Sequence, residues 1–114
     1  MADCIFCKIA SGEMNTDLVY EDDKVVAFED VNAQAPTHLL IVPKKHVPTL
    51  LDLQEDDYSL VAHIYKVANE LAEQQGIAED GFRIVANCKD DGGQTVYHIH
   101  FHLLGGRMLQ WPPG

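Results

Sequence analysis

Three of the six histidines stand at alternate positions near the end of the chain, a spacing that suits chemistry on one small ligand. They are His98, His100 and His102. The residues between and after them are apolar: Ile99, Phe101, Leu103 and Leu104. Successive side chains of a strand point to opposite faces, so the three imidazoles share one face at intervals of roughly 6.6 Å. On a helix they would spread around the axis and gain nothing from this spacing. The pattern therefore predicts a site on a strand over residues 94–104.

Three interpretations of this row can be weighed from its flanks. It could be a chance feature of a surface strand, a metal site built from neutral imidazoles, or a site of phosphoryl-group chemistry in which one imidazole attacks phosphorus. Gly93, Gln94 and Thr95 precede the row and offer backbone N–H groups and a hydroxyl where a phosphate would lie. Asn87 ends the preceding predicted strand and could bind a phosphate oxygen or the leaving group. These flanks favour phosphoryl chemistry.

The bulk composition narrows the class of protein. With 114 residues, 46% hydrophobic and 23% charged, the chain is expected to form one globular domain over residues 1–114. A net charge of −10 argues against a nucleic-acid partner, although a mononucleotide in a closed pocket remains compatible. There is no apolar run of the roughly 20 residues that a membrane span needs. The beginning of the chain lacks the features of a secretory signal, which predicts a cytoplasmic location.

The hydrophobic pattern predicts strands around one long helix. Strands are expected at residues 18–20, 24–30, 38–43, 82–87 and 94–104, with an acidic hairpin turn at residues 21–23 and a glycine-bearing turn at 89–93. From Gln54 onward the apolar period becomes about 3.6, and Gly76 suits the end of the helix. A short helical turn is expected at residues 4–9. This order indicates an α+β fold, with antiparallel pairing of the last two strands.

Several motifs together resemble the histidine triad (HIT) superfamily, and within it the Hint branch. The central one is His-Ile-His-Phe-His-Leu-Leu at residues 98–104. The others follow in order: Cys-Ile-Phe-Cys-Lys-Ile (4–9), Ala-Pro-Thr-His (35–38), Val-Pro-Lys-Lys-His (42–46), Gly-Gly-Gln (92–94) and Gly-Gly-Arg (105–107) with Trp-Pro-Pro-Gly (111–114). The resemblance covers nearly the whole chain.

This resemblance implies a fold, an assembly and an activity. The expected protomer has a five-stranded antiparallel sheet, one long helix and a short N-terminal helix, and two protomers join into a ten-stranded sheet as a homodimer. The implied activity is hydrolysis of purine nucleoside phosphoramidates, such as AMP linked to an amine or to lysine, and of aminoacyl adenylates. A purine mononucleotide is the implied ligand, and catalysis is expected to need no cofactor.

The resemblance also implies roles for individual residues. His100 would be the nucleophile that carries the nucleotide, while His102 and the Thr95 hydroxyl would contact the phosphate and leaving group. His38 and His98 would form an outer hydrogen-bonded pair that sets the tautomer of His100. The remaining implied contacts are with the ribose, from Asp30, and with the base, from Ile5, Phe6, Phe28 and Val31. Thr95 stands where the branch more often has serine.

The cysteines raise a separate possibility. Cys4 and Cys7 have a zinc-ligand spacing, and three cysteines argue against a disulfide framework. By similarity to metal-carrying members of the family, a structural zinc would be held by Cys4, Cys7, His46 and His98; the alternative is two reduced cysteines on an apolar turn. Three rival functions stay open: a dinucleoside polyphosphate hydrolase, a nucleotide-binding regulatory module, and a zinc-storage or zinc-sensing protein.

Overall fold

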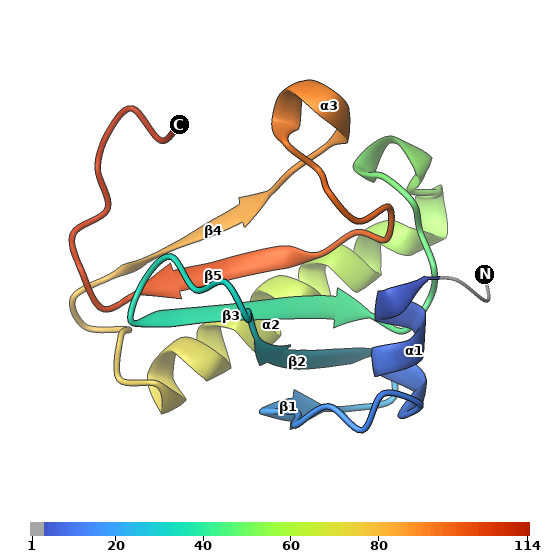
Figure 1. Ribbon diagram of the computed structural model, residues 1–114, viewed down its shortest axis with the longest axis horizontal. Coiled ribbons are helices and arrows are strands. Elements are labelled where there is room, and N and C mark those ends of the chain that lie inside the picture. The colour runs from blue at the N-terminus through green and yellow to red at the C-terminus, as the bar shows by residue number, and fades with distance from the viewer. Residues whose placement is uncertain (1–3) are drawn as a thin grey trace.

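The computed structural model describes residues 4–114, which build a single five-stranded sheet (Figure 1). The strands are β1 (Tyr20–Glu21), β2 (Val25–Glu29), β3 (Thr37–Pro43), β4 (Phe82–Ala86) and β5 (Phe101–Gly105). Their order across the sheet is β1-β2-β3-β5-β4, and every neighbouring pair is antiparallel. The predicted α+β class and five-stranded antiparallel sheet are confirmed.

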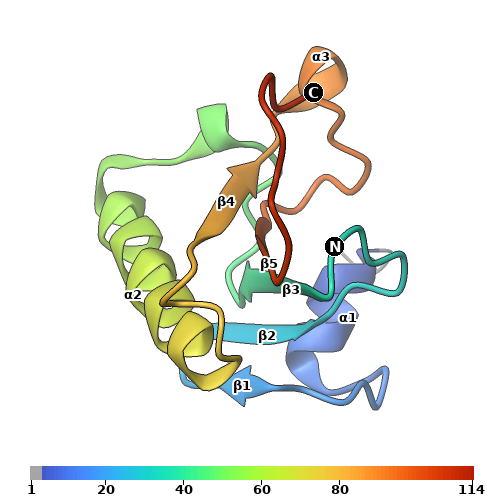
Figure 2. The same cartoon turned by 90° about the vertical axis from the view of Figure 1, so that its left-hand side faces the viewer.

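Helices cover the sheet unequally. The helices are α1 (Ile5–Ser11), α2 (Tyr58–Gln74) and the single turn α3 (Lys89–Gly92), with two short 3₁₀ turns at Leu50–Asp52 and Glu55–Asp57. Figure 2 shows α2 along one face of the sheet, with α1 and the C-terminal tail on the other side. Of the described residues, no helix is long and apolar enough to cross a membrane.

The α2 face of the sheet carries the larger hydrophobic core. The helix buries the face predicted from its period, with Ile64, Val67 and Leu71 fully buried against the sheet. The residues of β5 that face α2 are Phe101 and Leu103. Because side chains alternate along a strand, His102 must face the opposite side, toward α1. His98 and His100 lie on that side too, since their rings pack against Phe6 of α1.

The smaller core lies between α1 and the other face of the sheet. Phe6 and Ile9 of α1 pack against Val26, Phe28 and Leu40. Cys4 caps the start of the helix, because its Sγ accepts the backbone N–H of Cys7 at 3.3 Å. The helix ends at Gly12, whose φ of +90° is a left-handed conformation that suits glycine. This core therefore fixes α1 beside the histidine row.

Several boundaries differ from the sequence prediction. The long helix predicted from Gln54 begins only at Tyr58, after the separate 3₁₀ turn Glu55–Asp57. The first strand is confined to Tyr20–Glu21, and residues 89–92 form the helical turn α3 in place of an irregular turn. The strand of the histidine row begins only at Phe101, so that His98 and His100 precede it. The physical reason is that Ile99 donates its backbone N–H to Val47 (2.8 Å), beyond the end of β3, and not to the sheet ladder.

Candidate active site

A pocket of about 470 Å³ opens between α1 and the histidine row. Four side chains predicted for the base pocket line it, namely Ile5, Phe6, Phe28 and Val31. Asp30, His100, His102 and Thr95 line the same pocket. The fold thus brings together eight predicted site residues from the two ends and the middle of the chain. We call this hollow the apolar pocket, since most of its lining is hydrocarbon.

His100 is held in one tautomer. Its Nδ1 lies 2.8 Å from the backbone oxygen of His98, and a carbonyl can only accept, so Nδ1 carries the proton. In the neutral ring this leaves a lone pair on Nε2. Phe6 packs edge-on against the ring at 4.9 Å between centroids, which restricts its rotation. Among residues 4–114 Nε2 has no hydrogen-bond partner, and the ring borders the apolar pocket. His100 therefore presents an unprotonated nitrogen to a ligand.

The predicted pairing of His38 with His98 is wrong. His38 Nε2 lies 2.9 Å from His102 Nδ1. The register explains the difference, because His102 lies opposite Leu40 on β3, one pleat from His38 on the same face. His98 is turned away toward α1. The tautomer of His100 is thus set by a backbone carbonyl and not by another imidazole.

A chain of hydrogen bonds fixes the protons of the His38–His102 pair. The backbone N–H of Gln34 donates to His38 Nδ1 (3.0 Å), so His38 carries its proton on Nε2. That proton is donated to His102 Nδ1, which leaves the proton of His102 on Nε2. Asp30 Oδ2 is 3.3 Å from His38 Nε2 and shares this proton. His102 is therefore a hydrogen-bond donor beside the lone pair of His100.

Both imidazoles of the pair are uncharged at neutral pH. Burial above all, together with the nearby His100 and His38, lowers the pKa of His102 to about 4 against the raising effect of Asp30. Burial also lowers the pKa of His38, against the opposing effect of the Asp30 carboxylate. The arrangement of one donor and one lone pair thus holds across the physiological pH range.

A second cluster lies at the start of the row. Cys4, Cys7, His46 and His98 each direct one ligand atom to a common point, and these atoms lie within 4.8 Å of one another. The closest are His46 Nδ1 and His98 Nδ1 (3.2 Å), Cys4 Sγ and His98 Nδ1 (3.3 Å), and Cys7 Sγ and His46 Nδ1 (3.3 Å). We call these four residues the cysteine–histidine cluster.

The donor atoms of this cluster fit a tetrahedral zinc. Bonds of about 2.0–2.3 Å place the donors of such a site roughly 3.3–3.8 Å apart. His98 donates Nε2–H to the backbone oxygen of Pro43 (2.7 Å), which leaves its Nδ1 lone pair directed into the cluster. A ligand histidine whose other nitrogen donates to a carbonyl is the usual arrangement at metal sites. The residues present therefore suit the ion that the sequence analysis named.

The loop before the row contributes in two ways. Thr95 is exposed at the rim of the apolar pocket, where its hydroxyl can reach a ligand. Gln94 is buried, and its side chain bonds the backbone of Pro48, Val96 and Lys89. Its side chain holds the loop in place and is not available to a ligand. Gly93 ends α3 with a φ of +80°, so a side chain there would be strained.

Other residues of the site were not found from sequence. Met14 and Thr16, on the irregular segment after α1, line the apolar pocket, and Gln34 orients His38. No spacing or motif marks them, because their position depends on how α1 packs on the sheet. Asn87, which was predicted, borders a separate hollow next to His102.

Comparison with known proteins places this geometry in a family. The family model described as scavenger mRNA decapping enzyme C-term binding matches residues 3–110. The purine nucleoside phosphoramidase of Escherichia coli K12 is 50% identical over 105 residues, covering 92% of this chain and 88% of the relative. An uncharacterized HIT-like protein of Synechococcus elongatus is 48% identical over 112 residues, covering 98% of this chain and 97% of its own.

Solved structures agree with these relatives. A HIT family hydrolase from Legionella pneumophila Philadelphia 1 superposes with a TM-score of 0.96 at 54% identity, covering 98% of this chain and all of the other. A histidine triad protein from Clostridium difficile gives a TM-score of 0.94 at 49% identity, with 96% of both chains covered. The family match over most of the chain, the close relatives and the row of three histidines show that this chain belongs to the histidine triad (HIT) family, in its Hint-like branch.

Proposed function

We propose that this protein is a hydrolase that cleaves the phosphorus–nitrogen bond of purine nucleoside 5′-phosphoramidates through a nucleotidyl-His100 intermediate. The observation that carries the proposal is the fixed tautomer of His100, whose unprotonated Nε2 borders a pocket sized for a nucleoside. The 50% identity to a purine nucleoside phosphoramidase supports the same substrate class.

The first step is an attack by His100. Its Nε2 lone pair forms a bond to phosphorus while the bond from phosphorus to nitrogen breaks, and the nitrogen takes up a proton and leaves as an amine. The Nε2–H of His102 donates to the phosphoryl group. An anionic phosphoryl group raises the pKa of an adjacent imidazole, so substrate binding brings His102 toward the protonated form that can supply this proton. Substrate binding thus makes His102 the general acid of this step.

The second step regenerates the enzyme. Water attacks phosphorus, the bond to His100 breaks, and nucleoside 5′-monophosphate is released, so that one water is consumed for each phosphoramidate. The Thr95 hydroxyl at the pocket rim contacts the phosphate. The backbone N–H groups of Gly93 and Gln94 instead donate to the backbone oxygens of Asp90 and Lys89. Asp30 binds the ribose hydroxyls. Its carboxylate accepts from Asn32 N–H and lies beside His38, and it still has lone pairs that can accept further hydrogen bonds.

A turnover assay with two substrates tests this proposal. Wild-type protein and His100→Ala are given a fluorogenic adenosine 5′-phosphoramidate and, separately, diadenosine tetraphosphate. We expect phosphoramidate turnover in the wild type only, and mass spectrometry of quenched enzyme with a slow substrate to show AMP attached to His100. Turnover that survives in His100→Ala would reject the mechanism. Preferred cleavage of diadenosine tetraphosphate would indicate a dinucleoside polyphosphate hydrolase. Nucleotide binding without turnover of either compound would indicate a regulatory module.

We also propose that the cysteine–histidine cluster holds a structural zinc ion. The support is the convergence of two sulfurs and two imidazole nitrogens within 4.8 Å of one another, one of which, His98 Nδ1, carries a lone pair. The ion would tie α1 to the loop after β3 and to the first histidine of the row, and so fix the wall of the apolar pocket. Free cysteines fit a reducing compartment such as the cytoplasm. Metal analysis of protein purified without chelator should find one zinc per chain.

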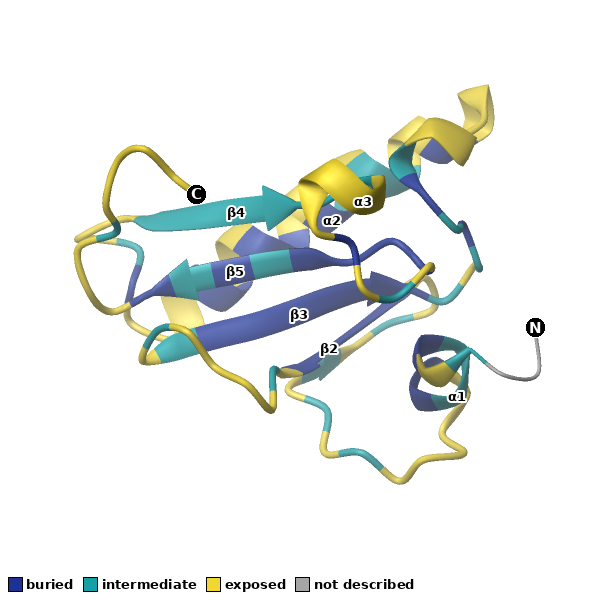
Figure 3. Ribbon diagram, turned by 45° about the horizontal axis from the view of Figure 1, so that its top comes forward, coloured by how far each residue is buried: buried dark blue, intermediate teal, exposed yellow. Residues whose placement is uncertain are grey.

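A homodimer is the assembly that we propose. β4 is an edge strand of the sheet, and all five of its residues are only partly buried (Figure 3). An edge of this kind can pair with a second copy to make a ten-stranded sheet. Trp111 in the tail is 80% exposed, which is unusual for tryptophan and suits a contact with the partner copy. Light scattering should give twice the mass of the chain; a monomer at assay concentration would reject this assembly.

A further inference from the structure

A second, smaller hollow lies on the other side of His102. It measures about 290 Å³, and its lining residues come from β3, β5, β4 and the C-terminal tail. Its floor includes His38, His102 and Asn87, and its remaining walls include Arg83 and Arg107. We call it the arginine pocket. His102 borders both hollows, so the histidine row separates the apolar pocket from the arginine pocket.

The charge of this pocket is opposite to that of the protein. Arg83 and Arg107 are the only arginines of the chain, whose net charge is −10, and no acidic side chain lines the hollow. Within residues 4–114, neither guanidinium has a carboxylate partner within 4.0 Å. The pocket therefore holds two positive charges that no side chain described here neutralises.

The two arginines are held in position by backbone oxygens. Arg83 Nη2 donates to Leu109 (3.4 Å) and Gln110 (3.0 Å) of the tail. Arg107 donates from Nε and Nη2 to the backbone oxygen of Gln34 (3.2 and 2.9 Å). A guanidinium has five N–H donors, so each keeps donors for a further acceptor. Carbonyls orient these side chains without cancelling their charge, which leaves them suited to bind an anion.

We infer that the arginine pocket receives the leaving group, and that it selects amines carrying a carboxylate. This inference rests on the proposed function. His100 borders the apolar pocket but not the arginine pocket, so a group that departs opposite to its attack moves past His102 toward Arg83 and Arg107. The preferred substrates are then nucleoside 5′-phosphoramidates of amino acids with a free carboxylate. Aminoacyl adenylates, which present a cationic ammonium to the same pocket, are poorer substrates.

A matched pair of substrates tests this selection. One is the adenosine 5′-phosphoramidate of β-alanine, and the other is the same compound with its carboxylate methylated. The measured quantity is the ratio of kcat/KM for the acid to that for the ester. We expect the wild-type ratio to exceed about 5 at low salt and to fall at high salt, since a charge-assisted hydrogen bond contributes about tenfold. A wild-type ratio of one or below overturns the inference without any variant.

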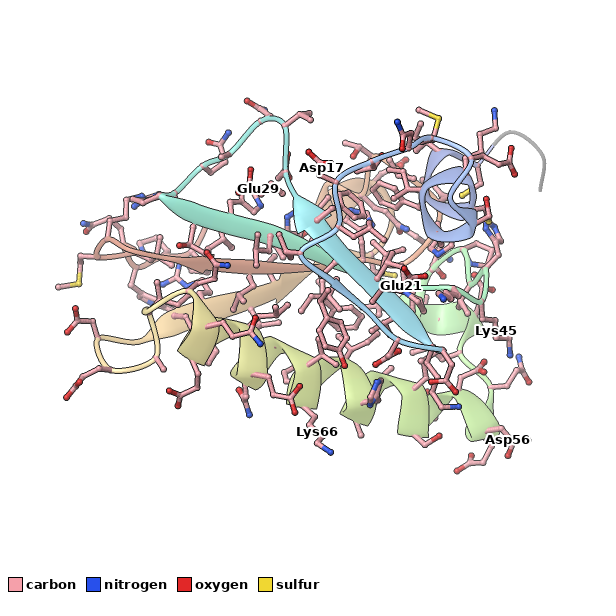
Figure 4. All side chains as sticks on the ribbon, turned by 90° about the horizontal axis from the view of Figure 1, so that it is seen from below. Asp17, Glu21, Glu29, Lys45, Asp56 and Lys66 are labelled. Atoms are coloured by element: carbon pink, nitrogen blue, oxygen red, sulfur yellow. The ribbon has the colours of Figure 1, made fainter. Side chains whose placement is uncertain are left out.

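Variants locate the source of the selection. Arg83→Gln and Arg107→Gln should each bring the ratio close to one, while Arg83→Lys keeps the charge and should retain most of it. Lys66→Gln is the control, because it removes the same charge from the outer face of α2, where Lys66 points away from the sheet (Figure 4). A ratio unchanged in both glutamine variants overturns the inference. Equal turnover of both substrates refutes the selection alone, whereas no turnover and no nucleotidyl-His100 refute the proposed function as well.

Discussion

The two ends of the histidine row have the same residue type but opposite surroundings. His98 donates its Nε2 proton to the backbone of Pro43 and points a lone pair at two cysteines and His46. His102 accepts a hydrogen bond on Nδ1 from His38 Nε2–H, which leaves its own N–H on Nε2, and its side chain borders the apolar pocket. Asp30, His38 and His102 also lie close enough to be metal ligands by distance alone. In that group, however, hydrogen bonds already occupy both nitrogens of His38 and Nδ1 of His102.

The difference shows that hydrogen bonds from nearby segments of the same chain determine which ring nitrogen of each imidazole carries the proton. A carbonyl or an N–H at one ring nitrogen decides whether the other is a lone pair or a donor. On this basis we propose His98 as a zinc ligand, His100 as the nucleophile and His102 as a hydrogen-bond donor. A substitution that disrupts the cysteine–histidine cluster should therefore leave catalysis intact, and one that disrupts the His38–His102 pair should leave zinc binding intact.

The largest expected effect is on stability, from Cys7→Ser. The variant should lose zinc and about 3 kcal/mol of unfolding free energy, the contribution of a ligand present at some hundred times its Kd. For a domain of this size that lowers Tm by about 10 °C or more. Below the new Tm, turnover should persist, because the carbonyl that orients His100 remains. Cys88→Ser, outside the cluster, is the control. Equal zinc content and Tm in the Cys7→Ser variant would contradict the proposed metal site.

At the other end, His38→Phe should damage catalysis and spare the metal. Loss of the donor leaves His102 Nδ1 without its partner, and the proton of His102 is then free to move from Nε2 to Nδ1. We expect kcat for the phosphoramidate to fall by about 10- to 100-fold, equivalent to roughly 1.4–2.7 kcal/mol. Zinc content and Tm should stay near the wild-type values. A variant that loses zinc together with activity would show that the two ends are coupled.

The sequence predicted the residue types of this site better than their connections. The alternation of histidine with apolar residues predicted one shared face for the three imidazoles, although only His102 lies on the strand itself, and the helix period predicted the core face of α2. The error concerned His38, whose partner depends on the register of β3 against β5. Register follows from packing of both strands on α2, which no local pattern contains. The same holds for Arg83 and Arg107, which share a pocket only after the tail has crossed the sheet.

A histidine–carboxylate pair outside the row gives a reference for a purely structural role. His63 of α2 lies 2.7 Å from Asp22 in the β1–β2 turn, and Tyr20 donates to the same carboxylate (2.8 Å). Although burial raises the pKa of Asp22, hydrogen bonds from Lys24 N–H, His63, Val25 N–H and Tyr20 outweigh it and hold that pKa well below the usual range. Asp22 is thus more easily ionised in the folded protein than in the unfolded chain.

We therefore expect Asp22→Asn to cost about 1 kcal/mol of unfolding free energy at pH 7, with kcat unchanged. A depressed folded-state pKa contributes stability above the unfolded value near 4, and this contribution is lost as pH falls below it. The difference between wild type and variant, measured by urea unfolding, should shrink as pH is lowered from about 5 toward 3. Asp23→Asn, at an exposed neighbouring position, is the control. A pH-independent difference would contradict the assigned network.

The smallest expected effect is at Thr95. Replacement by serine keeps the hydroxyl at the pocket rim and removes only the methyl group that stiffens the rotamer. We expect kcat to change by less than about threefold, whereas Thr95→Val, which removes the hydroxyl at nearly constant shape, should lower it by about tenfold. Equal rates for the serine and valine variants would show that the hydroxyl does not contact the phosphate.

The most direct test of these assignments is to observe the ring protons. Long-range nitrogen–proton NMR of histidine-labelled protein at neutral pH distinguishes the two neutral tautomers of each imidazole. The hydrogen bonds described here predict a proton on Nδ1 of His100 and protons on Nε2 of His98 and His102. A His100 ring protonated on Nε2 would have no lone pair to offer phosphorus, and that result would contradict its role as the nucleophile.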